Sequence, residues 1–144
     1  MSTPVDDYTR KWGPGTLQIG DTGSELDVSC LVNSLTITAS KDQGDSVTKL
    51  CGTVKPGPVS YTYELGGNLD TDVATESGLF ALSQSAKGSE QSFTYTPNAD
   101  GPTATGKVTI DPMDFGSDEY GATMASDIAW SISGDPAYSW PVTP

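Results

Sequence analysis

The sequence predicts a mainly β fold, and three observations support this prediction. Gly (16) and Pro (10) are abundant among the 144 residues, while hydrophobic residues make up 35%, a composition typical of all-β domains with many turns. Several short stretches alternate apolar and polar residues, as strands with one buried face do. Only one stretch has helical spacing. The length is the usual size of a single domain, and three Trp and six Tyr argue against a disordered chain.

The N-terminal part is expected to be an arm followed by strands. Residues 1–14 are polar and contain two Pro, so they are expected to be extended, with Trp12 either tucked onto its own domain or pressed into a neighbour. A short strand is predicted over residues 16–19. Residues 26–30 alternate between apolar and polar side chains, as a half-buried strand does. The apolar side chains then change from even-numbered to odd-numbered positions, and the alternation resumes at Leu35. That shift predicts a bulge or bend in one long strand.

A long hairpin is predicted in the next segment. The charged stretch SKDQGD, residues 40–45, separates two apolar strands and is expected to form the tip of the hairpin. Its second arm is expected over residues 46–54, and Pro56-Gly57-Pro58 then ends the strand pairing. Residues 59–65 alternate more regularly than any other stretch and are predicted to form a strand.

One helix is predicted between the two halves of the chain. Thr75 is its expected N-cap, and Lys87-Gly88 is a C-terminal signal. Leu79 and Phe80 lie between them at helical spacing and are expected to be core residues rather than a ligand pocket.

Three further strands are predicted over residues 91–96, 104–110 and 127–133. In the last of these, Trp130 alternates with apolar neighbours and is expected to lie in the core. Residues 111–126 connect the last two strands, and a structureless loop of this length is uncommon in a compact domain unless it has a function. The chain ends in DPAYSWPVTP, which is expected to be a tail laid against another surface.

The two cysteines, Cys30 and Cys51, enclose about twenty residues, and a disulfide between them would contribute about 3 kcal/mol. The N-terminal residues have no apolar core, so no signal peptide is expected, and thiols are the form expected in a cytoplasm. Two thiols without His are insufficient for a metal site. Both side chains are therefore expected to be buried on neighbouring strands. No stretch approaches the roughly 20 apolar residues of a membrane span.

The charge balance excludes several kinds of chemistry. Nineteen acidic residues face seven Lys and Arg, with no His, for a net charge of −12. Without His, a Ser-His-Asp or Cys-His arrangement is impossible, and no Gly-rich phosphate loop with its Lys is present. The acidic cluster of residues 111–119 lacks the spacing of an EF-hand and is expected to be a solvated loop rather than a calcium site. The sequence therefore predicts no enzyme, no cofactor and no metal.

The same charge bears on nucleic acids. Binding to a polyanion requires cationic groups that displace its counterions, and most of this surface would instead repel DNA. Such repulsion suits a wall that DNA must slide past without being held.

Four runs of the sequence carry a family resemblance: WGPGTLQIGDTGSELDVSCLVNSLTITASKDQGDSVTKLCG (residues 12–52), VSYTYELGGNL (59–69), QSFTYTPNADGPTATGKVTIDPMDFGSDEYG (91–121) and SDIAWSISGDPAY (126–138). In this order they resemble the tail tube, or major tail, proteins of long-tailed phages infecting actinobacteria. The resemblance covers most of the chain and is one of layout rather than of a catalytic signature.

The resemblance implies a fold and an assembly. The fold would be a two-sheet β-sandwich, barrel-like, with one short flanking helix, a long hairpin and extended terminal arms. Its domain would span residues 15–136, between an N-terminal arm of residues 1–14 and a C-terminal tail of residues 137–144. Subunits would form hexameric rings that stack into a tube with an acidic lumen, through which DNA leaves the virion.

Partners and contact residues also follow from the resemblance. The partners would be other copies of the chain, the tape measure protein and the tail terminator or baseplate proteins, in a virion tail assembled in the host cytoplasm and without a membrane. The inter-ring contact candidates are Trp12, Lys41, Asp42, Gln43 and Asp45. The lateral or axial contact candidates are Phe115, Tyr120, Tyr138 and Trp140. The polar strand faces offer Asp27, Thr36, Thr38, Lys49, Glu64 and Lys107 to the lumen, without a choice among them.

Three alternatives stay open at this point. The chain could be another phage structural protein, at the head–tail junction or decorating the capsid. It could be a carbohydrate-binding β-sandwich that displays Trp130, Tyr138 and Trp140, although Trp130 is expected to be buried. A glycoside hydrolase with paired carboxylates is the third, and no particular pair is indicated.

Overall fold

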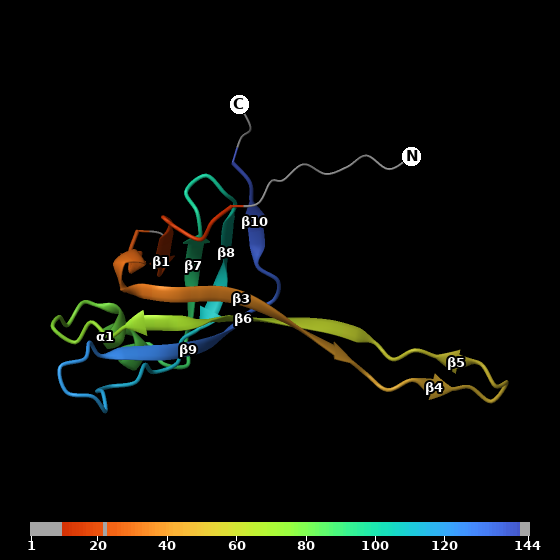
Figure 1. Ribbon diagram of the computed structural model, residues 1–144. Coiled ribbons are helices and arrows are strands. Elements are labelled where there is room, and N and C mark those ends of the chain that lie inside the picture. The colour runs from red at the N-terminus through yellow and green to blue at the C-terminus, as the bar shows by residue number, and fades with distance from the viewer. Residues whose placement is uncertain (1–9, 22, 142–144) are drawn as a thin grey trace.

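The computed structural model describes residues 10–21 and 23–141, and within them the fold is mainly β, as predicted (Figure 1). A short 3-10 helix, η1 (Ser29–Leu31), and one α-helix, α1 (Leu79–Ser85), accompany the strands. The strands are β1 (Thr16–Ile19), β2 (Leu26–Asp27), β3 (Val32–Gln43), β4 (Val47–Thr48), β5 (Val54–Lys55), β6 (Val59–Asp70), β7 (Glu90–Thr96), β8 (Thr103–Thr109), β9 (Ala125–Ile132) and β10 (Ala137–Ser139).

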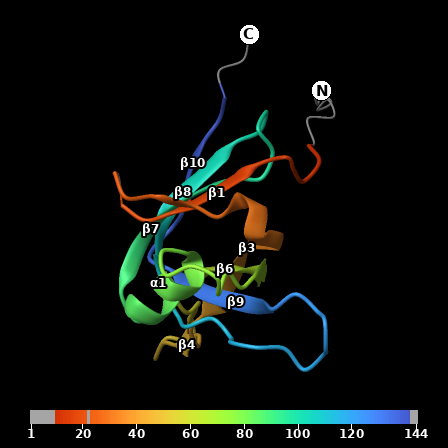
Figure 2. The ribbon, with the colours of Figure 1, turned by 90° about the vertical axis from the view of Figure 1, so that its left-hand side faces the viewer.

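One antiparallel sheet contains every strand except β4 and β5, in the order β2-β1-β7-β8-β9-β6-β3, with β10 paired to β8. Between β8 and β9 the ladder has one pair, Val108 with Ile132. The sheet bends at this joint, so that β1, β7, β8 and β10 form one layer and β3, β6 and β9 form a second layer that crosses it (Figures 1 and 2). The result is the two-layer arrangement that the resemblance implied.

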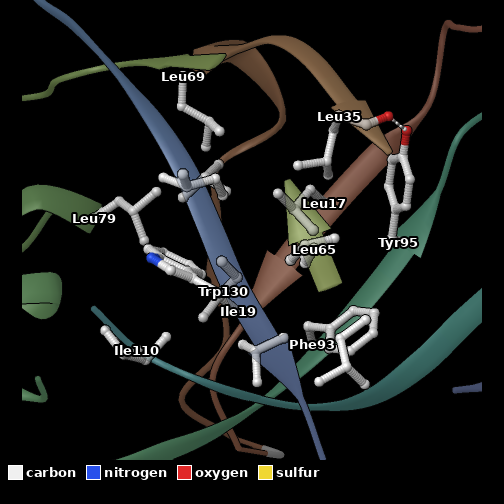
Figure 3. Packing of buried hydrophobic residues seen from close by; sticks show 14 of the residues in the cluster. Leu17, Ile19, Leu35, Leu65, Leu69, Leu79, Phe93, Tyr95, Ile110 and Trp130 are labelled. Carbon is white, nitrogen blue, oxygen red and sulfur yellow. Dashed lines mark hydrogen bonds between the residues drawn. The ribbon is translucent and has the colours of Figure 1, made fainter. Parts of the chain in front are cut away.

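The hydrophobic core fills the space between the two layers (Figure 3). Strand β9 shows the alternation most clearly, because every second residue from Ser126 to Ile132 is buried. Trp130 is 1% exposed, which confirms that it belongs to the core. Leu65 and Phe93, from opposite layers, are also buried, and each such side chain contributes about 1.5–3 kcal/mol by leaving water.

The predicted shift of parity is confirmed as a bulge at the start of β3. Val32 pairs with Leu69 whereas Ser34 pairs with Asn68, so Asn33 is an extra residue in the ladder. The single long strand expected from residue 26 is nevertheless interrupted. The Asp27 carboxylate accepts hydrogen bonds from the Ser29 backbone N–H (3.1 Å) and hydroxyl (2.5 Å), and this local turn replaces strand pairing with η1.

The predicted position of the hairpin tip was wrong. Residues 40–43 lie inside β3, which pairs with β6 as far as Gln43 with Val59, and the hairpin continues through β4 and β5. Its tip is at residues 49–52, where the Lys49 carbonyl accepts from the Gly52 N–H at 2.9 Å. Gly52 has a φ of +90°, which a glycine adopts without strain. The charged residues 40–43 were predicted to be a turn because this end of β3 projects from the body. Both of its faces are exposed, so the strand is as polar as a turn.

Thr75 is not the N-cap of α1. The helix starts at Leu79 with Gly78 as N-cap, and the Asp72 carboxylate accepts from the N–H groups of Leu79 (2.7 Å) and Phe80 (2.8 Å). A Cβ at Gly78 would overlap this carboxylate. The acceptor therefore comes from a preceding loop rather than from the adjacent residue. Leu79 is buried, as expected, whereas Phe80 is only partly buried.

The long connection between β8 and β9 has no helix or strand over residues 111–124. Hydrogen bonds from residues near its start attach this connection to the body. The buried Met113 donates its N–H to the Ser83 hydroxyl at 3.2 Å, and Asp114 donates to the Ser126 hydroxyl at 2.9 Å. Residues 10–21 and 23–141 contain no helix long and apolar enough to cross a bilayer.

The expectation for the cysteines was also wrong. Cys30 and Cys51 are both exposed free thiols. Cys30 lies in η1, which took the place of the expected strand, and Cys51 lies at the hairpin tip. The two positions are at opposite ends of β3, so the side chains neither share a core nor face each other.

Candidate assembly surfaces

The outer face of the β3-β6-β9 layer is acidic and lined by small side chains. The register sets Thr38 beside Glu64 and Glu64 beside Ser131, so one row crosses all three strands. We call the outward positions of this layer the acidic face: Ser34, Thr36, Thr38, Ser40, Asp42, Ser60, Thr62, Glu64, Gly66, Asn68, Asp70, Ala125, Asp127, Ala129 and Ser131. These positions include four carboxylates and no Lys or Arg.

Asparagine amides hold two of these carboxylates in place. The Asn33 amide donates to Asn68 Oδ1 and to Asp70 Oδ1, both at 2.9 Å. The Asn68 amide in turn donates to Asp127 Oδ1 at 2.8 Å. The amides supply donors without adding positive charge, so they position these carboxylates without offsetting the negative charge of the face.

The outer face of the other layer is close to neutral. Its outward positions on β7 and β8 are mostly Ser and Thr, with Glu90 and Lys107 as the charged residues. Of the residues proposed for a lumen from the sequence, the structure therefore brings Thr36, Thr38 and Glu64 together on the acidic face. It places the others apart from it, with Asp27 in β2, Lys49 at the hairpin tip and Lys107 on the opposite layer.

Trp12 lies against its own domain at one edge and is open at the other. Its indole N–H donates to the Tyr95 hydroxyl at 2.6 Å. That hydroxyl donates to the Leu35 carbonyl at 2.8 Å (Figure 3). Burial raises the pKa of Tyr95, and the hydrogen bond from Trp12 opposes this rise. Trp12 itself remains 54% exposed. It is thus a fixed aromatic side chain with a free surface.

Tyr138 and Trp140 extend the exposed aromatic surface that Trp12 begins. Tyr138 is on β10, so residues 137–139 of the expected tail join the sheet. The two rings are 6.2 Å apart and inclined at 45°, and both are exposed. Trp12, Tyr95 and Tyr138 line one hollow of about 300 Å³. The structure therefore gathers Trp12, an inter-ring candidate, with Tyr138, a lateral or axial candidate.

The connection between β8 and β9, which carries Phe115 and Tyr120, runs on the side of β9 and away from β10 (Figure 2). The Phe115 ring stacks on Phe80 of α1, with centroids 5.5 Å apart, yet Phe115 remains 74% exposed. Tyr120 is fully exposed. The segment offers a second aromatic surface on the side of the helix.

The hairpin projects from the body as a two-stranded arm (Figure 1). Lys41, Asp42, Gln43 and Asp45 are all exposed on it. Sequence reasoning missed Leu50, which is fully exposed at the tip. It was assigned to the second arm, although a Gly two positions later is a turn signal that could have placed it correctly.

In the described part of the chain, no three His, Cys, Asp or Glu side chains gather in a way that could hold a metal ion. Trp130 is buried and cannot be part of an exposed sugar-binding platform.

No protein-family model matches the sequence, and no curated protein matches it. Solved structures do match the fold. A chain from the tail of an empty gene transfer agent particle, with C6 symmetry, aligns with a TM-score of 0.58 at 14% identity, over 89% of this chain and 96% of that chain. The two chains share a fold. A chain from the virion of a native gene transfer agent particle aligns with a TM-score of 0.57 at 15% identity, over 85% and 95% of the two chains. The resemblance seen in the sequence is thus confirmed as one of fold, and an actinobacterial phage origin stays a prediction.

Proposed function

We propose that this protein is a structural virion protein, a subunit of hexameric rings that stack into a phage tail tube. One observation carries the proposal: its fold matches, over nearly the full length of both chains, a chain from a tail with C6 symmetry. In this role the protein has no catalytic function. Its partners are other copies of itself, a tape measure protein and tail terminator or baseplate proteins, in a tail assembled in the host cytoplasm.

The acidic face is proposed to line the lumen of the tube. Six copies would surround the channel with carboxylates from Glu64, Asp70 and Asp127 and with small side chains. DNA would meet like charge and no Lys or Arg from this face, so it would release no counterions and gain no affinity. The near-neutral face of the other layer would then point away from the channel.

The exposed candidates are proposed to make the contacts between subunits. Trp12 and the hairpin residues Lys41, Asp42, Gln43 and Asp45 would contact the next ring. Phe115, Tyr120, Tyr138 and Trp140 would make lateral or axial contacts. All nine side chains are exposed in the isolated subunit, and large exposed aromatics that cluster are typical of interaction surfaces.

Electron microscopy of the concentrated protein tests the ring. Negative stain should show rings or tubes with a central hole, and class averages of end views should show sixfold symmetry. A strictly monomeric protein at high concentration and moderate salt would contradict the proposal. Rings that never stack would instead favour a head–tail junction protein.

Thiol labelling tests the lumen separately. Thr38→Cys on the acidic face and Lys107→Cys on the opposite layer are compared in a Cys30→Ser, Cys51→Ser background, with a maleimide on a bulky polyethylene glycol. Both thiols should react in unassembled protein. In tubes, only the thiol at position 107 should react readily. The reverse pattern would reject the lumen assignment while leaving the ring intact.

A further inference from the structure

The hairpin tip carries apolar side chains that nothing in the subunit requires to be there. Leu50 has 107% relative exposure, and Val47 and Val54, on the two strands behind it, are 54% and 58% exposed. An isolated two-stranded hairpin is at best marginally stable in water. Exposed apolar residues gathered at the end of a projecting arm are typical of a surface that binds a partner.

A pocket of matching character lies on the body, beside Cys30. Its volume is about 290 Å³, and its walls include Trp12, Leu17, Val32 and Tyr95. Cys30 contributes to the lining and is exposed. The walls are largely apolar and aromatic, so the pocket suits an aliphatic side chain and not a charged one.

The tip and the pocket are at opposite ends of the molecule. Cys30, in η1, comes just before the first residue of β3, and the tip lies beyond its last. In Figure 1, η1 is the orange turn at the left end of β3, and the tip points to the right. The 12 residues of β3 alone span about 40 Å at about 3.3 Å per residue. The tip therefore cannot reach the pocket of its own subunit, whereas a head-to-tail contact between copies builds an open stack.

Charge favours the same pairing. Residues 47–55 contain Lys49 and Lys55 and no acidic residue, although the whole chain has a net charge of −12. Asp27 lies next to the pocket, because its carboxylate bonds to Ser29, a lining residue. Hydrogen bonds from Ser29 lower the pKa of Asp27, so this carboxylate stays charged at neutral pH. The positive tip is thus complementary to the net charge of the subunit and to Asp27, whereas Arg10 and Lys11 are the cations next to Trp12.

We propose that Leu50 of one copy inserts into the Cys30 pocket of a copy in the next ring, which sets Cys51 of the first beside Cys30 of the second. This inference rests on the proposed stacking of rings, and it specifies both contact surfaces, the hairpin tip and the Cys30 pocket.

The two native cysteines test the contact directly, because the chain has no others. The variants Cys30→Ser and Cys51→Ser each keep one thiol. Assembled protein is oxidised with copper-phenanthroline under oxygen, which takes up the two electrons and two protons released as two thiols form one disulfide. Hydrogen bonds with Thr53 lower the pKa of Cys51, which favours the reactive thiolate.

The expected pattern on a non-reducing gel is specific. An equal mixture of the two variants should give a covalent dimer, the unmodified chain should give a ladder, and each variant alone should remain monomeric. Dimers formed by one variant alone as efficiently as by the mixture would overturn the pairing. So would assembled tubes in which neither oxidation nor a short bis-maleimide links the mixture.

Leu50→Ser, with Val59→Ser as its matched control, tests the tip without cysteine chemistry. Leu50 is fully exposed and Val59 is 46% exposed at the base of the hairpin, so both variants should keep the unfolding transition of the parent. Leu50→Ser should reduce sedimentable tubes at least tenfold, while Val59→Ser should leave them nearly unchanged. Stacked rings that tolerate Leu50→Ser would reject this contact alone, whereas a parent chain that forms no rings would reject the proposed function.

Discussion

The Asp72 carboxylate fixes the start of α1 by accepting two backbone N–H groups, those of Leu79 and Phe80. Replacing Asp72 with Ala leaves both donors without this partner. We expect the free energy of unfolding to fall by about 1–2 kcal/mol, measured by urea denaturation of unassembled protein.

Thr75→Ala is the matched control, because Thr75 bonds only within a local turn, to Ser77. Its effect should stay within about 0.5 kcal/mol. Equal losses for the two variants would mean that the loop, and not the carboxylate, determines where the helix begins.

Tyr95 makes stability depend on alkaline pH. Burial raises its pKa above the ordinary value of 10.0, so the unfolded chain ionises this phenol first as the pH rises. The resulting contribution to the free energy of unfolding is complete below pH 10 and is lost as the pH rises from there through the higher folded pKa. Tyr95→Phe should cost about 1–2 kcal/mol at neutral pH by removing the hydrogen bond to Leu35 and the acceptor for Trp12, and its stability should fall less steeply above pH 10. Parallel pH curves for the parent and the variant would contradict this assignment.

At the scale of elements, sequence patterns correctly predicted the features that depend on residues close together in the chain. Residues 16–19 were predicted as a strand with the bounds of β1, and the parity shift identified the bulge at Asn33. The failures have non-local causes. Asp72 caps α1 from seven residues away, and β10 forms because it pairs with β8, a partner distant in sequence. The pattern of residues within a short stretch of sequence reveals neither of these contacts.

The distal hairpin should be dispensable for folding and necessary for stacking. Every residue of β4 and β5 is exposed, so these strands add nothing to the core between the layers. Replacing residues 45–57 with an Asn-Gly turn should change the free energy of unfolding by less than about 1 kcal/mol. Microscopy should then show separate rings or monomers and no tubes. Tubes built by the shortened chain would remove the hairpin from the stacking contact.

At the scale of the whole molecule, net charge should control assembly. Subunits with a charge of −12 repel one another. Salt reduces the range of this repulsion, the Debye length, from about 30 Å at 0.01 M to about 10 Å at 0.1 M. We expect the fraction of protein in rings, measured by sedimentation, to rise over this range. Assemblies that dissolve as salt approaches physiological levels would show that attraction between the cationic tip and the acidic body outweighs the net repulsion.

The acidic face could not be recognised from the sequence alone. Its residues come from three segments and lie together only because β6 pairs with both β3 and β9. The polar strand positions that the sequence offers to a lumen therefore mix Glu64 with Lys49 and Lys107, which the fold separates. The number of acidic residues was visible in the composition, whereas their collection on one face depends on topology.

The joint between β8 and β9 has a mechanical consequence. One ladder pair and the adjacent hydrogen bond from Ser133 to the Lys107 carbonyl connect the layers there, so the angle between them is set mainly by side chains such as Trp130. In a sixfold ring, an error in that angle is repeated in every subunit and changes the curvature of the wall. In the proposed tube, core packing would then set the diameter of the channel, and a substitution that trims Trp130 without unfolding the subunit would alter that diameter.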